Sequence, residues 1–139
     1  MSAIPGMIET DSTDERPDMP GFATLAMINL DAEDPAALAA FYSQVLGWEV
    51  QHSQDEYAMI GDGSTSIGFG KVPGYSGPGW PGESTPKRFH LDFYVDDLDK
   101  AEEQALALGA TSPSEQPQPN RWRVLLDPAG HPFDVCLRS

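Results

Sequence analysis

Apolar and polar residues alternate along the chain with the period of helices in some segments and of strands in others. This patterning begins near Gly21, where we predict that the ordered domain starts. Residues 22–30 (FATLAMINL) are mostly apolar, free of proline and of strand length. Asp34 and Pro35 then provide a helix N-cap and a first helical residue. The predicted helix ends at Gly47, a common left-handed terminus. Its apolar stripe has helical spacing and consists of Leu38, Phe41, Tyr42, Val45 and Leu46.

Three short strands are predicted after this helix, because apolar runs of strand length alternate there with turn signals. They cover residues 48–52, 57–60 and 66–71, and the hairpin-favouring pair Asp62-Gly63 precedes the third. Residues 72–87 then contain four glycines and four prolines. Such a composition is typical of a long surface loop.

The second half of the chain repeats the order of the first. Residues 88–95 alternate as a strand, and Asp96 or Asp97 is expected to cap a helix that ends at Gly109. The apolar face of this helix comprises Leu98, Ala101, Ala105 and Leu108, and strands are predicted over residues 122–126 and 133–137.

This repetition indicates an internal duplication of a βαβββ unit. We therefore predict an α+β fold in which two paired βαβββ modules form a curved mixed sheet with a concave ligand pocket. One domain is expected over residues 21–139, with modules at 22–71 and 88–139 joined by the loop. Residues 1–20, which are acidic and proline-containing, are expected to form a flexible tail.

The net charge of the chain limits the classes of partner that we expect it to bind. With 22 acidic and 8 basic residues, its net charge is −14, which repels phosphate backbones and anionic lipid headgroups. Nucleic acid and membrane are therefore not expected as partners, and no apolar run approaches the roughly 20 residues that span a bilayer. The single cysteine, Cys136, agrees with a reducing compartment. We expect a cytoplasmic protein.

Three segments resemble the vicinal oxygen chelate superfamily, which includes glyoxalases, bleomycin-resistance proteins and dioxygenases. They are DPAALAAFYSQVLGWEV, HLDFYVDDLDKAEEQALALGA and LLDPAGHPFDVC, and they occur in the expected order. The resemblance covers residues 22–139. It implies a glyoxalase-like fold, a small-molecule ligand, a homodimer and, in many members, a divalent metal ion.

The resemblance also implies where metal ligands would stand. Metal-dependent members take one ligand from the first and one from the last strand of each half. His90 and Asp134 match the second-half positions. The first-half positions fall among Leu25, Ala26 and Met27 and among Ile67, Gly68 and Phe69, which are not usual ligands. We therefore expect no metal cofactor, with a divalent ion held by His90 and Asp134 as the alternative.

Strand alternation places four polar or aromatic residues on the face that points into the pocket: Arg88, His90, Asp92 and Tyr94. Asp134 should face the same way. The alternatives are a structural His90 hydrogen-bonded beside Asp92, and an Asp134 that is ion-paired with Arg88 or Arg123.

Aromatic residues are the remaining candidates for the pocket wall. They are Phe69, Trp80 and Trp122, and core packing is an alternative for Phe69 and Trp122. His131 is expected to be a surface residue of the closing turn.

The sequence leaves three classes of function open. The first is a binding protein, or a metal-independent enzyme, for a small and partly apolar molecule. The second is a metal-dependent lyase, isomerase or dioxygenase that uses His90 and Asp134. The third is a regulatory partner of a larger protein. Whether the chain is an enzyme stays open at this point.

Overall fold

The two helices begin at the predicted capping residues. In the first helix, α1 (Pro35–Leu46), the Asp34 side chain accepts a hydrogen bond from the backbone N–H of Ala37, and Gly47 follows with a φ of 75°. The second helix, α2 (Leu98–Ala107), is capped by Asp97, whose side chain accepts from the N–H of Lys100. These caps satisfy backbone donors that a helix start leaves without an intrahelical partner.

The computed structural model describes residues 21–22, 24–77 and 90–138. Its seven strands are β1 (Ile28–Ala32), β2 (Glu49–Ser53), β3 (Tyr57–Gly61), β4 (Ser66–Lys71), β5 (Leu91–Val95), β6 (Trp122–Leu126) and β7 (Pro132–Leu137). The predicted tail and most of the predicted loop lie outside the described residues.

The strands form two sheets with one shared topology. The first sheet has the order β1-β4-β3-β2, and the second has the order β5-β7-β6. In each, the first strand of the module pairs in parallel with the last, and the remaining pairs are antiparallel. Where the first module has β2, the second has one bridge, between Thr111 and Leu126. The predicted duplication and the α+β fold are confirmed, although the described strands form two sheets rather than one.

The predicted first strand is wrong in its position. Pairing with β4 begins at Ile28, opposite Ile67, so the strand starts six residues later than predicted and extends to Ala32. Phe22 and Leu25 lie before it and are exposed. Apolar character alone suggested a strand there, but a strand needs a hydrogen-bonded partner, and β4 reaches only as far as Ile28.

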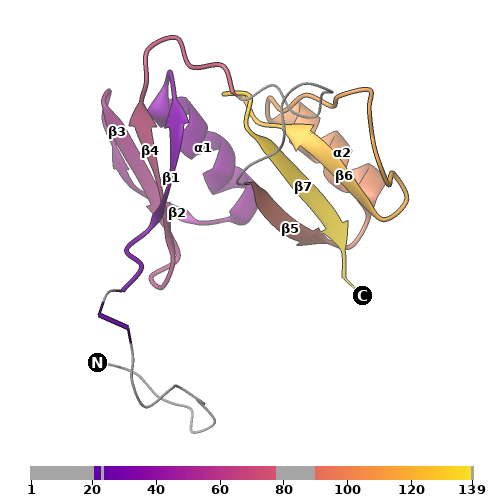
Figure 1. Cartoon of the computed structure of the whole chain (residues 1–139), viewed down its shortest axis with the longest axis horizontal. Coiled ribbons are helices and arrows are strands. Elements are labelled where there is room, and N and C mark those ends of the chain that lie inside the picture. The colour runs from indigo at the N-terminus through magenta and orange to yellow at the C-terminus, as the bar shows by residue number, and fades with distance from the viewer. Residues whose placement is uncertain (1–20, 23, 78–89, 139) are drawn as a thin grey trace, which may run out of the picture.

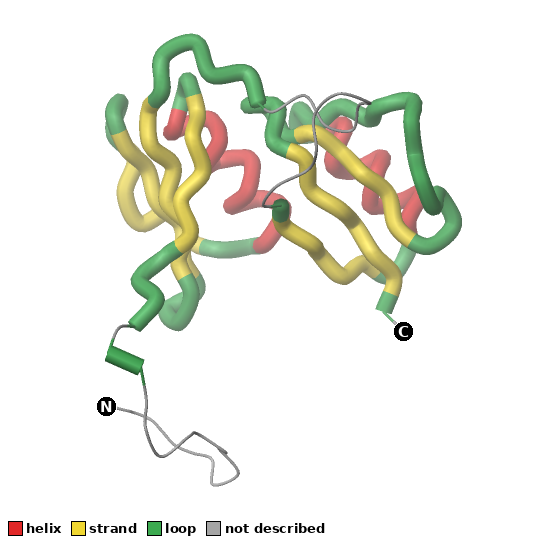
Figure 2. The backbone as a smooth tube through the Cα atoms, in the orientation of Figure 1, coloured by secondary structure: helices red, strands yellow, loops and turns green. Residues whose placement is uncertain are grey.

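Both helices lie on the same side of their sheets, and the two sheets stand side by side (Figures 1 and 2). Neither described helix has the length and apolar character that crossing a bilayer requires. Neither described helix covers the opposite faces, and that face of the second sheet carries the polar residues of β5 and β7.

One aromatic residue of α1 belongs to the core of both modules. The Tyr42 ring is fully buried and stacks on Phe69 of the first module, with ring centroids 5.9 Å apart. The same ring lies 6.2 Å from Phe93 and 6.1 Å from Phe133 of the second module. These aromatic contacts make one continuous core across the two modules.

The Tyr42 hydroxyl adds a polar link between the modules. It donates a 2.6 Å hydrogen bond to Oδ2 of Asp127, a buried residue in the turn between β6 and β7. Burial raises the pKa of Tyr42 well above its ordinary value, and the neighbouring carboxylate raises it further. Burial also raises the pKa of Asp127, against the hydrogen bonds that lower it. The buried Asp127 carboxylate accepts several hydrogen bonds, and these offset part of the free-energy cost of burying its charge.

The raised pKa of Asp127 predicts a specific pH dependence of stability. A carboxyl group that binds its proton more tightly in the folded state stabilises the fold most below its unfolded pKa, and this contribution is lost as the pH rises through the folded pKa. Relative to Asp127→Asn, the wild-type free energy of unfolding should therefore fall as the pH rises above about 4, the ordinary pKa of an aspartate. Urea unfolding at several pH values measures it, and a relative stability that rises with pH would contradict this assignment.

Candidate functional site

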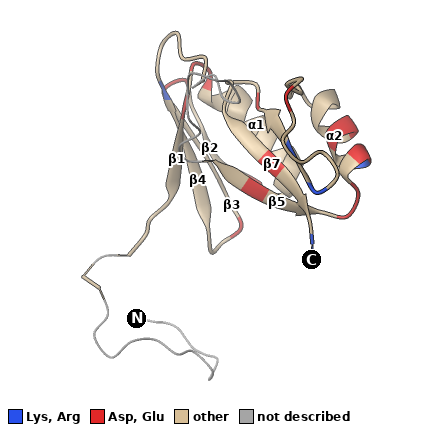
Figure 3. Cartoon of the chain, turned by 45° about the vertical axis from the view of Figure 1, so that its right-hand side comes forward, with Lys and Arg blue, Asp and Glu red and all other residues tan. Residues whose placement is uncertain are grey.

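Three polar side chains meet on the face of the second sheet that neither described helix covers. Parallel pairing of β5 with β7 sets Asp92 directly beside Asp134, and His90 immediately precedes β5 on the same face. Figure 3 shows the acidic positions on both strands. Alternation explains the arrangement, because Leu91, Phe93 and Val95 point the other way and pack against the core.

The imidazole of His90 bridges the two carboxylates. Its Nε2 lies 3.2 Å from Oδ1 of Asp92 and 3.3 Å from Oδ2 of Asp134. The Asp92 side chain is 60% exposed, His90 is 22% exposed and Asp134 is 7% exposed. One potential ligand atom from each residue lies within 4.8 Å of the others, so the group could hold a metal ion. Imidazole and carboxylate donors suit divalent first-row metals.

The other ring nitrogen of His90, Nδ1, is buried and has no hydrogen-bond partner among the described residues. A buried polar atom without a partner costs about 1–3 kcal/mol relative to a satisfied one. A polar atom of a bound molecule at this position would remove that cost.

The equivalent positions of the first module carry different chemistry. Asn29 pairs with Gly68 as Asp92 pairs with Asp134, and Met27 precedes Asn29 as His90 precedes Asp92. The Tyr57 hydroxyl lies 3.1 Å from the Met27 sulfur. The first module therefore offers no imidazole or carboxylate at the positions that correspond to His90 and Asp134.

A cavity of about 330 Å³ lies between the two modules. Its apolar walls come from β1 and the start of β5, and Tyr42 of α1 also lines it. His90 is one of its polar groups. The lining residues are Ile28, Asn29, Leu30, Tyr42, His90, Leu91, His131 and Pro132. A mostly apolar lining with a few polar groups is the usual character of a small-molecule site, and the volume is at the lower end of the usual range.

The turn after β6 closes one side of this cavity. Oδ1 of Asp127 accepts hydrogen bonds from the backbone N–H groups of Ala129 and His131, at 2.8 and 2.9 Å. The His131 ring stacks on Tyr75, with centroids 4.9 Å apart, and its Nε2 lies 2.5 Å from the carbonyl oxygen of Asp31. The interpretation of His131 as a surface turn residue is therefore wrong. The residue is half-buried and joins the modules.

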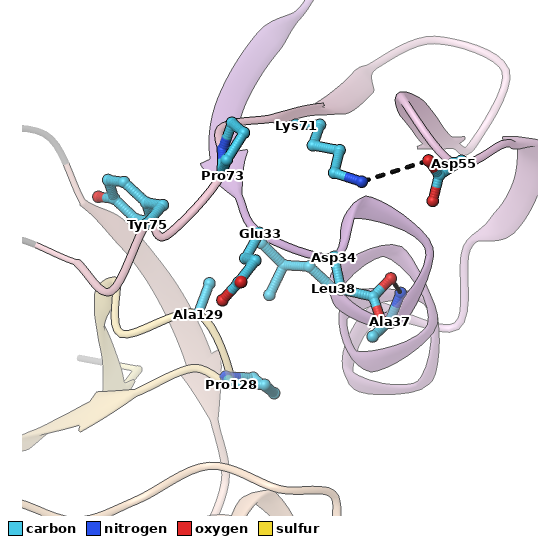
Figure 4. A pocket seen from close by; sticks show the side chains of 10 residues that line it. All are labelled: Glu33, Asp34, Ala37, Leu38, Asp55, Lys71, Pro73, Tyr75, Pro128 and Ala129. Carbon is cyan, nitrogen blue, oxygen red and sulfur yellow. Dashed lines mark hydrogen bonds and ion pairs between the residues drawn. The ribbon is translucent and has the colours of Figure 1, made fainter.

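A second cavity, of about 780 Å³, lies beside the start of α1 (Figure 4). Acidic residues line it, together with Lys71, which pairs with Asp55 at 3.2 Å. Tyr75 also lines this cavity, whereas His131 lines the smaller one. The stacked rings of Tyr75 and His131 therefore separate the two cavities.

The other described residues that were predicted to line the pocket do not line the cavity between the modules. Phe69 packs in the core against Tyr42. Tyr94 is exposed beneath the Arg138 guanidinium, and Trp122 is half-buried on the adjoining strand pair. Arg123 pairs with Asp99 and Glu102, at 2.8 and 2.9 Å. Trp80 and Arg88 lie outside the described residues, so their predicted roles stay predictions.

Sequence reasoning missed part of the cavity wall. Asn29, Tyr42 and His131 line it, although none was predicted to. Alternation could have placed Asn29, because it occupies the position equivalent to Asp92. The role of His131 depends on Asp31 and Tyr75, which are distant in sequence, so no local pattern signals it.

Comparison with known proteins agrees with this architecture. The model of the glyoxalase-like domain family matches residues 27–136. A protein of Mycobacterium tuberculosis named "Putative glyoxylase CFP32" is 32% identical over 121 residues, which are 81% of this chain and 43% of that protein. The chain thus spans less than half the length of this curated relative.

Solved structures show the same fold. A glyoxalase/bleomycin resistance protein/dioxygenase family enzyme from Burkholderia phytofirmans is 29% identical, with a TM-score of 0.59 over 83% of this chain and 98% of that one. The fosfomycin resistance protein FosX from Listeria monocytogenes is 18% identical, with a TM-score of 0.62 over 86% of this chain and 96% of that one. The second similarity concerns the fold alone.

Asp92 and Asp134 differ in burial, so replacing each of them by alanine provides a matched test of the cluster formed by His90, Asp92 and Asp134. Asp134→Ala should lower the free energy of unfolding by about 1–3 kcal/mol, because it leaves the polar groups around a buried carboxylate unsatisfied. Asp92→Ala, on the neighbouring strand, should cost less than about 0.5 kcal/mol, since Asp92 is mostly exposed. Urea unfolding of both variants measures the difference. Equal losses would contradict the different environments assigned to the two side chains.

Proposed function

Because the chain belongs to the glyoxalase-like domain family, we propose that it binds a small, partly apolar molecule in the cavity between its modules, without a catalytic metal. The cavity of about 330 Å³ carries this proposal. Its apolar residues exclude water from a ligand, and His90 and His131 offer polar contacts that orient one. His90 is the polar residue of the second module that we expect a ligand to contact first, because it lines the cavity at the start of β5.

The metal-free part of the proposal is supported by the asymmetry between the modules. Structural equivalence pairs His90 with Met27 and Asp134 with Gly68. A thioether is a poor ligand for the divalent ions that imidazole and carboxylate prefer, and glycine offers no side chain. Binding, or catalysis through protein groups alone, fits these residues better than a four-ligand metal centre.

A metal-dependent lyase, isomerase or dioxygenase is the second candidate. It is favoured by the approach of His90, Asp92 and Asp134 to within 4.8 Å. Asp92 would add a third donor to the two ligands proposed from the sequence, and a metal ion there would polarise substrate oxygen atoms. Names such as glyoxylase or fosfomycin resistance protein describe the relatives, and their substrates are not assigned to this chain.

We also propose an oligomeric state, a cellular location and a class of partner. We expect a homodimer in the cytoplasm, with a small molecule as partner. The net charge of −14 argues against nucleic acid and anionic membrane surfaces.

Blocking the cavity should abolish binding. N-phenyl-1-naphthylamine, an uncharged and apolar fluorophore, should bind the wild type saturably at about one site per chain. Ile28→Trp should weaken that binding by at least about tenfold, because the indole would occupy the cavity. Val50→Trp is the matched control, since Val50 and Ile28 are both 40% exposed strand residues and Val50 does not line the cavity. Fluorescence titration measures all three proteins, and equal affinities would place the probe elsewhere.

Elemental analysis separates the two candidate functions. Protein purified without chelator and incubated with Zn, Ni, Fe, Mn or Co should retain less than about a tenth of an equivalent per chain, because so few ligands are present. About one equivalent, lost in His90→Ala, would overturn the metal-free proposal and establish the cluster as a metal centre.

A further inference from the structure

The turn between β6 and β7 holds three parts of the first module. Asp127 of this turn accepts the hydrogen bond from Tyr42 of α1. The ring of His131 reaches the carbonyl oxygen of Asp31 in β1 and stacks on Tyr75, which follows β4. The turn therefore contacts elements on two sides of the cavity between the modules.

The chemistry of the His131 contacts fixes its tautomer. A carbonyl oxygen only accepts, so Nε2 carries the proton that is donated to Asp31. Nδ1 then has a lone pair, and the Tyr75 hydroxyl, 3.3 Å away, can donate to it. Partial burial raises the pKa of Tyr75, with the acidic residues Asp31 and Asp127 adding to the shift, so its hydroxyl keeps the proton that this contact needs.

The backbone around this contact leaves little freedom. A Cβ atom at Gly77 would collide with the backbone of Gly130, and one at Gly130 would collide with the carbonyl of Ser76. Both glycines have a φ of 94°. The segment from Val72 to Gly77 is thus pressed against the turn, and His131 is held in place by its own backbone bonds with Asp127.

From these contacts we infer that His131 is a positioning residue of the ligand cavity. It holds β1 and the segment 72–77 against the second module, and thereby fixes the wall that faces His90. This inference rests on the proposed function, because the cavity is the proposed ligand site. His131 lines the cavity itself, but its role is to set the separation of the walls and to keep the two cavities apart.

Loss of this contact should shift the protein toward a form with separated walls. One net hydrogen bond is worth about 1 kcal/mol, or about a fivefold change in a local opening equilibrium. A ligand that binds only the closed form loses apparent affinity in proportion to the population of that form. His131→Ala should therefore weaken binding of the naphthylamine probe severalfold while leaving the core packing of α1 intact.

The experiment compares wild type, His131→Ala and His131→Gln by hydrogen exchange and by probe titration. In His131→Ala, the amides of Val72 and Tyr75, which bond Ala32 and Val72, should exchange about fivefold faster. Amides in the middle of α1 should keep their wild-type rates. His131→Gln keeps a donor for the Asp31 carbonyl and should restore at least half of the lost protection and affinity, and a failure to restore either would contradict the role of this hydrogen bond.

Each outcome distinguishes the inference from the proposed function. Unchanged exchange in His131→Ala would overturn the positioning role, whether or not the probe binds. Faster exchange with unchanged affinity would overturn the link between His131 and the cavity. Faster exchange of α1 as well would mean a general loss of stability and would also overturn it. If the wild type fails to bind the probe, the proposed site fails, while exchange still decides whether His131 anchors the segment 72–77.

Discussion

The arrangement of this protein depends on one side chain that serves both halves of a duplicated chain. Tyr42 lies on a first-module helix, yet its ring packs against aromatic residues of both modules and its hydroxyl bonds a carboxylate of the second. A buried hydroxyl needs a partner, and a buried carboxylate needs donors. Asp127 satisfies Tyr42 and, through its other oxygen, orders the turn that carries His131. Core packing and the shape of the cavity are therefore coupled at this point.

The sequence predicted the local elements well, because their causes are local. Asp34 with Pro35, and Asp97, lie at helix starts where their side chains satisfy free backbone donors. Alternation placed His90 and Asp92 on the face opposite Leu91 and Phe93. The first strand was misplaced because its start depends on where β4 begins, and β4 lies more than thirty residues away.

Features that depend on distant pairing could not be predicted in this way. His131 takes its role from Asp31 and Tyr75, which are 100 and 56 residues away. The contact of His90 with Asp134 needs the register of β5 on β7, and the family resemblance, rather than the residue pattern, brought those two side chains together in the prediction. Helix caps and the periodic spacing of apolar residues can be recognised in one sequence. The register between strands that are distant in the chain is known only from the structure.

The two modules share one topology, but equivalent positions on their sheets carry different residues. Gly68 occupies the position equivalent to Asp134, and a Cβ atom there would collide with the side-chain oxygen of Asn29 and lie 2.8 Å from the Tyr57 hydroxyl. A single substitution at Gly68 therefore cannot add a metal ligand without displacing the side chains that cover it. The first module is committed to packing at this position, and the second holds the imidazole and carboxylates. The lining of the cavity comes from β1 and α1 of the first half and from the starts of β5 and β7 in the second, so a molecule bound in it would contact both halves.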